Sequence, residues 1–325
     1  EIESTMRREA GSVVDESWVG TGVKSSTREL RLNQIILAAD ANLFENWNGK
    51  VVMRWGFFNA PVDYHSLVTV PDLGGGWVME ESYLTYSNPA KSSFFMKAGK
   101  GFTPFGKYSN PFELTPTLIQ SLSELNETYL QLGLASVDNW HASVSGWTTA
   151  SDLSDSADHG DLQYILDFGF TQNMFGAGVN FDASYIADIN EVISHRSYNH
   201  LPNPGSGTKD SAWQVGLATK VADFDVGARY MSINTNNTQN IFLVHAGYTV
   251  NMLEHDNSII MDYESTNSAA TPLNSRISVA WILGVADNID AELKYIGFSS
   301  QQHLATDMIP AANPSLWTFT VTGRF

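Results

Sequence analysis

The C-terminal stretch of the chain, residues 315–325, alternates apolar and polar side chains with a period of two. Trp317, Phe319, Val321 and Phe325 share one parity, and the residues between them are mostly threonines. This period predicts a β-strand with one apolar and one mostly polar face, because successive side chains of a strand point to opposite faces. The rest of the chain must supply partners for this strand.

The same alternation recurs along the whole chain, and short segments rich in glycine and polar residues join the alternating stretches in pairs. Such pairs predict antiparallel hairpins. The pattern predicts sixteen strands, at residues 17–24, 31–44, 50–59, 76–87, 94–102, 125–135, 140–150, 161–171, 177–187, 211–220, 223–232, 239–250, 258–264, 276–285, 290–298 and 315–325. Apolar residues at the i, i+3, i+4 spacing of a helix occur only at 115–125, in the long loop between the fifth and sixth predicted strands.

Tight turns and longer polar loops alternate between these strands. With the N-terminus inside, the tight turns fall on one side and nearly every long loop on the other, as in outer-membrane barrels. We therefore predict an all-β fold, a transmembrane antiparallel up-and-down β-barrel of about 16 strands. Six tryptophans near strand ends fit the aromatic girdles of such a barrel: Trp18, Trp55, Trp77, Trp140, Trp213 and Trp317. The alternative is an ordinary antiparallel sheet with one solvated face.

The composition fits a chain with two kinds of surface, one apolar and one polar. Charged residues make up 16% of the sequence, below the roughly 25% of soluble domains. No apolar run approaches the ~18 residues that a spanning helix needs. The chain has 35 acidic and 18 basic residues, a net charge of -17, which argues against nucleic acid as a partner. Cysteine is absent, and we expect no cofactor.

The predicted domain organisation is simple. Residues 1–14 are expected to form an N-terminal periplasmic extension, interpreted either as a remnant of a coiled region or as a tail. Residues 15–325 are expected to form a single transmembrane barrel. The chain begins with glutamate rather than methionine, so we expect a mature or trimmed form whose leader has been removed.

If the apolar parity faces lipid, the polar parity faces a lumen, and a sixteen-stranded barrel is wide enough to enclose an aqueous channel. The sequence thus predicts a transport protein. The candidates for the solute path are charged residues, mostly on the polar parity: Arg31, Arg54, Glu81, Lys97, Lys107, Glu127, Asp167, Asp182, Asp225, Arg229, Asp262, Glu264, Asp290, Glu292 and Lys294.

Residues 104–124, between the fifth and sixth strands, carry three prolines and an apolar stretch. An apolar stretch exposed to water is unfavourable, so we expect this loop to fold inward and narrow the channel. The candidates for the constriction are Pro104, Phe105, Phe112 and Leu118. The alternative is an external loop that packs on its neighbours. Lys97, Lys100 and Lys107 near this loop would attract an anionic solute.

Metal-binding and catalytic patterns are weak. Asp155, Asp158 and Asp161 lie in an acidic stretch that offers oxygen ligands for Ca²⁺, but the order lacks the glycine and closing glutamate of an EF-hand loop. A solvated loop is the favoured interpretation. His141 shares a strand parity with Ser143, yet neighbouring polar residues are expected in any lumen. We expect no enzymatic activity.

Residues 94–107, Phe-Phe-Met-Lys-Ala-Gly-Lys-Gly-Phe-Thr-Pro-Phe-Gly-Lys, resemble the LbtU-type siderophore porins. The resemblance implies an outer-membrane barrel that takes up a small solute passively, a ferric siderophore in the sharper form of the hypothesis, without a plug domain. Family members carry a coiled N-terminal region, and residues 1–10 are too short to be all of it. The terminal strand ending in Phe325 resembles the closing strand that the barrel assembly machinery reads.

The expected location is the outer membrane of a Gram-negative bacterium, with lipid and lipopolysaccharide around the barrel. Two alternatives to siderophore uptake stay open. One is a general diffusion porin with no bound substrate. The other is a structural or adhesive barrel whose loops bind host or envelope partners.

Overall fold

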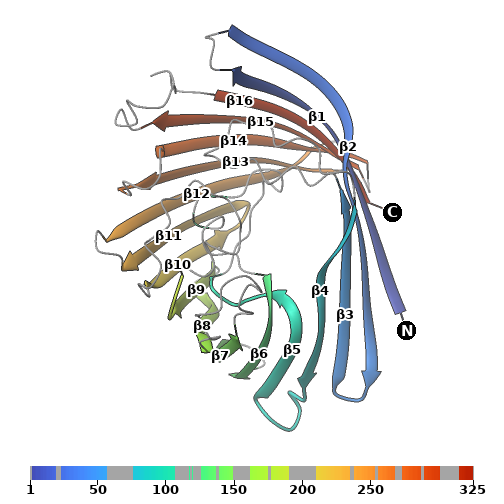
Figure 1. Ribbon diagram of the computed structural model, residues 1–325, viewed down its shortest axis with the longest axis vertical. Helices are drawn as coiled ribbons and strands as arrows, with labels where there is room; N and C mark the ends of the chain where they lie inside the picture. The colour runs from blue at the N-terminus through green and yellow to red at the C-terminus, as the bar shows by residue number, and fades with distance from the viewer. Residues whose placement is uncertain are drawn as a thin grey trace, which may run out of the picture.

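The protein, seen in a computed structural model, forms one closed antiparallel sheet that runs in chain order (Figure 1). The structure describes residues 2–19, 23–56, 76–106, 117, 119, 126–136, 139–148, 162–174, 177–189, 210–234, 238–252, 255–267, 273–286, 289–300 and 315–324. No helix among these residues is both long enough and apolar enough to span a membrane.

The sheet contains sixteen strands within the described residues, the number that the sequence predicted. They are β1 Ile2–Val19, β2 Val23–Phe44, β3 Trp47–Gly56, β4 Gly76–Ser87, β5 Phe94–Phe102, β6 Asn126–Ala135, β7 Trp140–Thr148, β8 Leu162–Met174, β9 Ala177–Ile186, β10 Ser211–Val221, β11 Phe224–Asn234, β12 Gln239–Met252, β13 His255–Thr266, β14 Leu273–Ala286, β15 Ile289–Ser300 and β16 Ser315–Arg324. The predicted fold class, an up-and-down barrel, is confirmed.

The barrel closes through β1, which Figure 1 shows between β16 and β2. The register runs from Arg7 opposite Arg324 to Val13 opposite Thr318 on one side. On the other side β1 pairs with β2 along its whole length. Closure gives every strand two neighbours, so the sheet has no unpaired edge.

Two expectations about the N-terminal region are wrong. Residues 2–14, predicted as an extension, lie in β1, and the strand predicted at 17–24 contains the connection between β1 and β2. Charged residues such as Arg7 and Arg8 hide the alternation here. Their backbone groups nevertheless pair with β2 and β16, because an open barrel would leave them unsatisfied in lipid.

The two faces of the sheet have the polarity of a membrane barrel. Along β8, Leu166 and Phe168 are exposed on the outside, whereas Gln163 and Asp167 are buried on the inside. Exposed leucine, valine, phenylalanine and methionine side chains recur on the outer parity of the other strands. A soluble sheet would place these side chains in its core, so this surface suits lipid.

The two ends of the barrel differ in the length of their connections. At one end, adjacent strands follow each other closely, as where β10 ends at Val221 and β11 begins at Phe224. Ala222 in this turn has a φ of 52°, a left-handed conformation that tight hairpins require. Residues 57–75, 103–125, 149–161, 187–210 and 301–314 connect strands at the other end.

Replacing the outward-facing Val144 with arginine should lower the free energy of unfolding by about 2–4 kcal/mol, because a cation near the middle of the lipid face is costly. Ser143→Arg is the matched control, since the adjacent side chain points into the lumen and should cost much less. Urea titration of the protein refolded into phospholipid vesicles measures both. Equal losses would contradict the assignment of the two faces.

Candidate functional site

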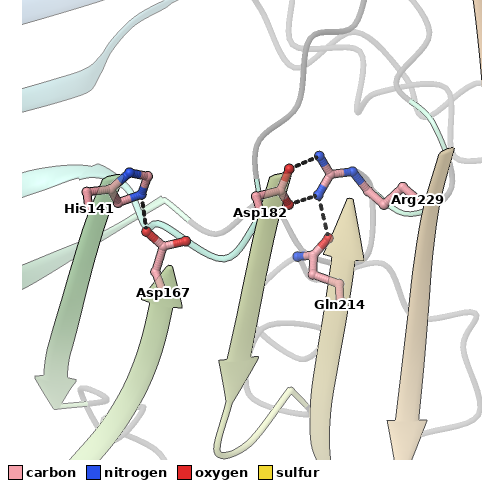
Figure 2. A network of polar contacts seen from close by, with 5 residues as sticks. All are labelled: His141, Asp167, Asp182, Gln214 and Arg229. Carbon is pink, nitrogen blue, oxygen red and sulfur yellow. Dashed lines mark hydrogen bonds and ion pairs between the residues drawn. The ribbon is translucent and has the colours of Figure 1, made fainter. Parts of the chain in front are cut away.

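A row of polar and glycine positions crosses the inner wall from β7 to β11. His141 pairs with Gly169, and Gly169 pairs with Asp182. Asp182 in turn pairs with Gly216, and Gly216 with Arg229. These residues share the inner parity of their strands, so the charged side chains project into the same level of the lumen (Figure 2).

Asp182 and Arg229 form a bidentate ion pair across β10. Nη1 and Nη2 of Arg229 donate to Oδ2 and Oδ1 of Asp182 at 2.6 and 2.9 Å. Gln214 accepts a third bond from Nη1 through Oε1 at 3.3 Å (Figure 2). Two parallel bonds fix both the distance and the orientation of the guanidinium group. This part of the wall therefore carries a fixed dipole but almost no net charge.

Glycines make this arrangement possible. A Cβ atom at Gly216 would lie 2.7 Å from Oδ1 of Asp182 and 2.9 Å from Nη2 of Arg229, and one at Gly169 would overlap the His141 ring. The strands between the charged residues therefore carry no side chain at this level, and the long side chains lie flat across the wall.

Histidine–carboxylate pairs occupy two further places on the wall. His141 Nε2 lies 2.8 Å from Oδ2 of Asp167 (Figure 2). His245 Nδ1 lies 2.8 Å from Oδ1 of Asp262, and its Nε2 lies 3.6 Å from Oδ1 of Asp225. An ionised carboxylate only accepts hydrogen bonds, so the close histidine nitrogen donates in each pair.

The loop after β5 reaches the wall at β13. The backbone N–H of Ile119 donates to Oε1 of Glu264 at 3.4 Å. Glu264 also pairs with Arg276 of β14, whose Nε lies 3.0 Å from Oε2. The hydrogen bond between Ile119 and Glu264 joins residues 145 positions apart in the chain.

An apolar cluster of buried side chains, the apolar seat, gathers Phe105 and Ile119 of this loop with side chains from β6 to β12 and the segment after β9. Its members are Phe105, Ile119, Tyr129, Trp147, Ile165, Ile186, Ile189, Ala212, Met231, Ile233 and Ile241. Apolar wall residues would face water unless something covered them. Phe105 and Ile119 are fully buried against them.

The wall of β3 to β6 is more aromatic. Lys97 Nζ lies 3.8 Å from the ring centroid of Tyr83 and 5.3 Å from that of Tyr129. Lys50 Nζ lies 3.5 Å from Oε2 of Glu81 on the neighbouring strand. Cations held over tyrosine faces gain from the ring quadrupole, so Lys97 is held in a defined position.

Most of the predicted path residues lie in described strands. Those on the same parity as the inward-facing contacts above are Glu81, Lys97, Glu127, Asp167, Asp182, Asp225, Arg229, Asp262, Glu264, Asp290, Glu292 and Lys294. Arg31 lies in β2 and Arg54 in β3. Lys294 is buried, with Nζ 4.0 Å from Oε1 of Glu292.

Several predicted positions fall outside the described residues, namely Lys107, Phe112, Leu118, Asp155, Asp158, Asp161 and Phe325. Pro104 and Phe105 are described, and Phe105 belongs to the apolar seat. Within the described residues, no three histidine or acidic side chains gather as metal ligands would.

Sequence reasoning missed the apolar seat and some of the polar contacts. Ile165, Ile186 and Ile241 lie on the parity that was read as lumen. Apolar residues on both parities near the loop end of a strand would have indicated that something covers the inner wall there. Gln214 and Arg276 were also missed, although both lie on the polar parity of their strands.

The serine and histidine residues of β7 do not form a nucleophile–base pair in the described structure. His141 is bonded to Asp167. The hydroxyl of Ser143 accepts a hydrogen bond from Nε2 of Gln131 at 2.9 Å. A hydrolase of this kind would need the serine hydroxyl within hydrogen-bond reach of the histidine.

The sequence matches no protein-family model and no curated protein. Its fold, in contrast, matches solved porin structures over the whole chain. OprB of Pseudomonas putida has a TM-score of 0.70 at 11% identity and is covered to 94%. OmpF of Salmonella typhi has a TM-score of 0.65 at 10% identity and is covered to 97%. An anion-selective porin from Comamonas acidovorans has a TM-score of 0.62 at 9% identity and is covered to 99%. The chain thus has the porin fold.

Breaking the Asp182–Arg229 pair should destabilise the barrel by about 1.5–3 kcal/mol, as expected for hydrogen bonds to charged groups. Asp182→Asn and Arg229→Gln should each lower the free energy of unfolding, and the double variant should lose less than the sum. The control cycle uses Lys50 and Glu81, whose partly exposed pair should couple by less than about 1 kcal/mol. Urea titrations in vesicles give both coupling energies, and equal couplings would contradict the structural role of the bidentate pair.

Proposed function

We propose that the protein is a diffusion channel of the bacterial outer membrane that passes small hydrophilic solutes. The observation that carries the proposal is the closed sixteen-stranded barrel with an apolar outer face and a charged inner face. A barrel of this size leaves room for an aqueous lumen. The likeness to porins supports the fold on which the proposal depends. The proposal includes no enzymatic step.

The proposal extends to the loop after β5, which we assign as the constriction of the channel. Ile119 bonds to Glu264 of β13, and Phe105 packs in the apolar seat with residues of β8 to β12. Both contacts lie on the inner wall. A loop held against that wall reduces the cross-section open to solutes, and its fixed charges and dipoles act on whatever passes.

Two partners belong to the same proposal. Lipid and lipopolysaccharide would surround the apolar outer face. The barrel assembly machinery would read the terminal strand that ends in Phe325, a residue outside the described part of the chain.

The purified protein, refolded and reconstituted in planar bilayers, should form open channels, and deleting residues 114–122 should raise their conductance. Ile119→Ala removes an apolar loop contact and should make the conductance larger or less steady, whereas Leu132→Ala on the outer face should not. Unchanged conductance after the deletion would place the loop outside the solute path. Absence of channels from the intact protein would favour a structural or adhesive barrel.

A narrower proposal is uptake of a ferric siderophore, and it rests on the resemblance of residues 94–107 to the LbtU-type siderophore porins. A ferric chelate that enters the lumen would interrupt the ionic current while it is bound. A general diffusion porin would pass the same chelate without preference, or exclude it by size.

A ferric siderophore added on the loop side should reduce the single-channel current reversibly and with a saturating concentration dependence. The iron-free chelator at equal concentration is the control. If both leave the current unchanged, the protein is a general diffusion porin and the narrower proposal is wrong.

A further inference from the structure

Lys97 differs from four other cations that the structure describes on the inner wall. Lys50, Arg229, Arg276 and Lys294 each lie within 4.0 Å of a carboxylate. No carboxylate of the described residues lies that close to Lys97, which contacts the rings of Tyr83 and Tyr129. Glu81 lies near enough to act on the Lys97 charge, but it is engaged by Lys50 at 3.5 Å, so Lys97 retains part of its attraction for a mobile anion.

The backbone of β5 builds the position of this cation. Gly99 pairs with Tyr83 on one side and with Tyr129 on the other, so the two tyrosines flank a bare position. Gly99 has a φ of 136°, and a Cβ atom there would overlap the backbone of β4. Only glycine fits this conformation and this space.

The Lys97 side chain extends along this bare strip toward the loop. A Cβ atom at Gly101 would lie 3.7 Å from Lys97 Nζ and 3.3 Å from the Tyr83 ring. The ammonium group therefore lies beside Gly101, one residue before the end of β5. Tyr129 is fixed by its hydroxyl, which donates to the carbonyl of Phe102 at 2.8 Å.

Further aromatic side chains lie on the same face of this sheet region as the cation. Phe95, two residues before Lys97, lies over Gly133 of β6, where a Cβ atom would overlap its ring. Tyr129 is buried, and with Phe105 it belongs to the apolar seat. This sector of the wall thus offers the Lys97 ammonium group beside two aromatic rings, whereas β9 and β11 offer Arg229 already paired with Asp182.

We propose that Lys97, Tyr83 and Tyr129 form a binding subsite in the channel for a monocarboxylate with an aromatic or apolar body. The carboxylate would bind the ammonium group, and the body would pack against the aromatic side chains. A single ammonium group can bind one carboxylate through charge-assisted hydrogen bonds, and the tyrosine rings beside it suit an apolar or aromatic body. This inference rests on the proposed channel function and adds the class of solute.

The test measures block of the single-channel current of the full-length protein by benzoate. Acetate supplies the carboxylate without the apolar body, and benzyl alcohol supplies the ring without the charge. Benzoate should block at lower concentration than either. Lys97→Met should weaken benzoate block about tenfold, as expected for loss of one hydrogen bond to a charged group, and should shift the reversal potential in a salt gradient toward cations.

Lys220→Met is the matched control, because it removes a lysine from the inner parity of β10, where Lys220 pairs with Asp225 of β11, away from the two tyrosines. The ratio of benzoate to acetate block should stay unchanged in this variant. Tyr83→Leu should weaken block by benzoate while leaving block by acetate nearly the same.

The absence of native cysteine allows a second test within one variant. Lys97→Cys should lose benzoate block, recover it after reaction with an aminoethyl methanethiosulfonate, and fail to recover it after reaction with the sulfonatoethyl reagent. Open channels in which benzoate blocks no better than acetate, or in which Lys97→Met has no effect on block, would overturn the subsite alone. Absence of channels in the unmodified protein would overturn the channel function itself.

Discussion

The structure depends on one constraint, the need to satisfy every backbone N–H and C=O group inside lipid. An open sheet leaves two edges unpaired, and each unpaired group costs several kcal/mol in hydrocarbon. β1 removes both edges by pairing with β2 and β16. This requirement recruits a polar N-terminal segment into the barrel, although its own sequence shows little of the alternation that marks the other strands.

Closure fixes the two faces of every strand and so decides what each side chain meets. Outward leucine, valine and phenylalanine side chains suit lipid, and the inner wall then collects the ionisable residues of many strands. Arg229 and Asp182 pair across β10 only because Gly216 leaves the space between them empty. Tyr83 and Tyr129 flank Lys97 because Gly99 and Gly101 leave β5 bare. Glycine thus shapes both the charged and the aromatic parts of the wall.

The inner wall has three chemically different parts: an apolar part, a part with paired charges and the part around Lys97. Their positions relative to the loop after β5 would decide which solutes the proposed channel favours. The apolar seat holds Phe105 and Ile119. Further from the loop end of the strands, paired charges such as Asp182 and Arg229 form oriented dipoles with little net charge. The sector around Lys97 offers a cation that lies against tyrosine rings, with no described carboxylate within 4.0 Å. A solute that passes the proposed constriction would meet these surfaces together, so selectivity would arise from the difference between paired and unpaired charge.

The sequence alone determined the class of fold and the strand count, because a period of two in side-chain polarity is a local property that any single strand reveals. It also placed Asp167, Asp182, Arg229 and Glu264 on the polar parity, which the structure puts on the inner face of the barrel. It did not reveal that β1 closes the barrel, since pairing with β16 depends on residues more than 300 positions away. Nor did it reveal which charges pair, where Ile119 meets β13, or that Lys97 lies between two tyrosines. Those contacts depend on the register between strands and on the empty space above glycines, which only the tertiary structure decides.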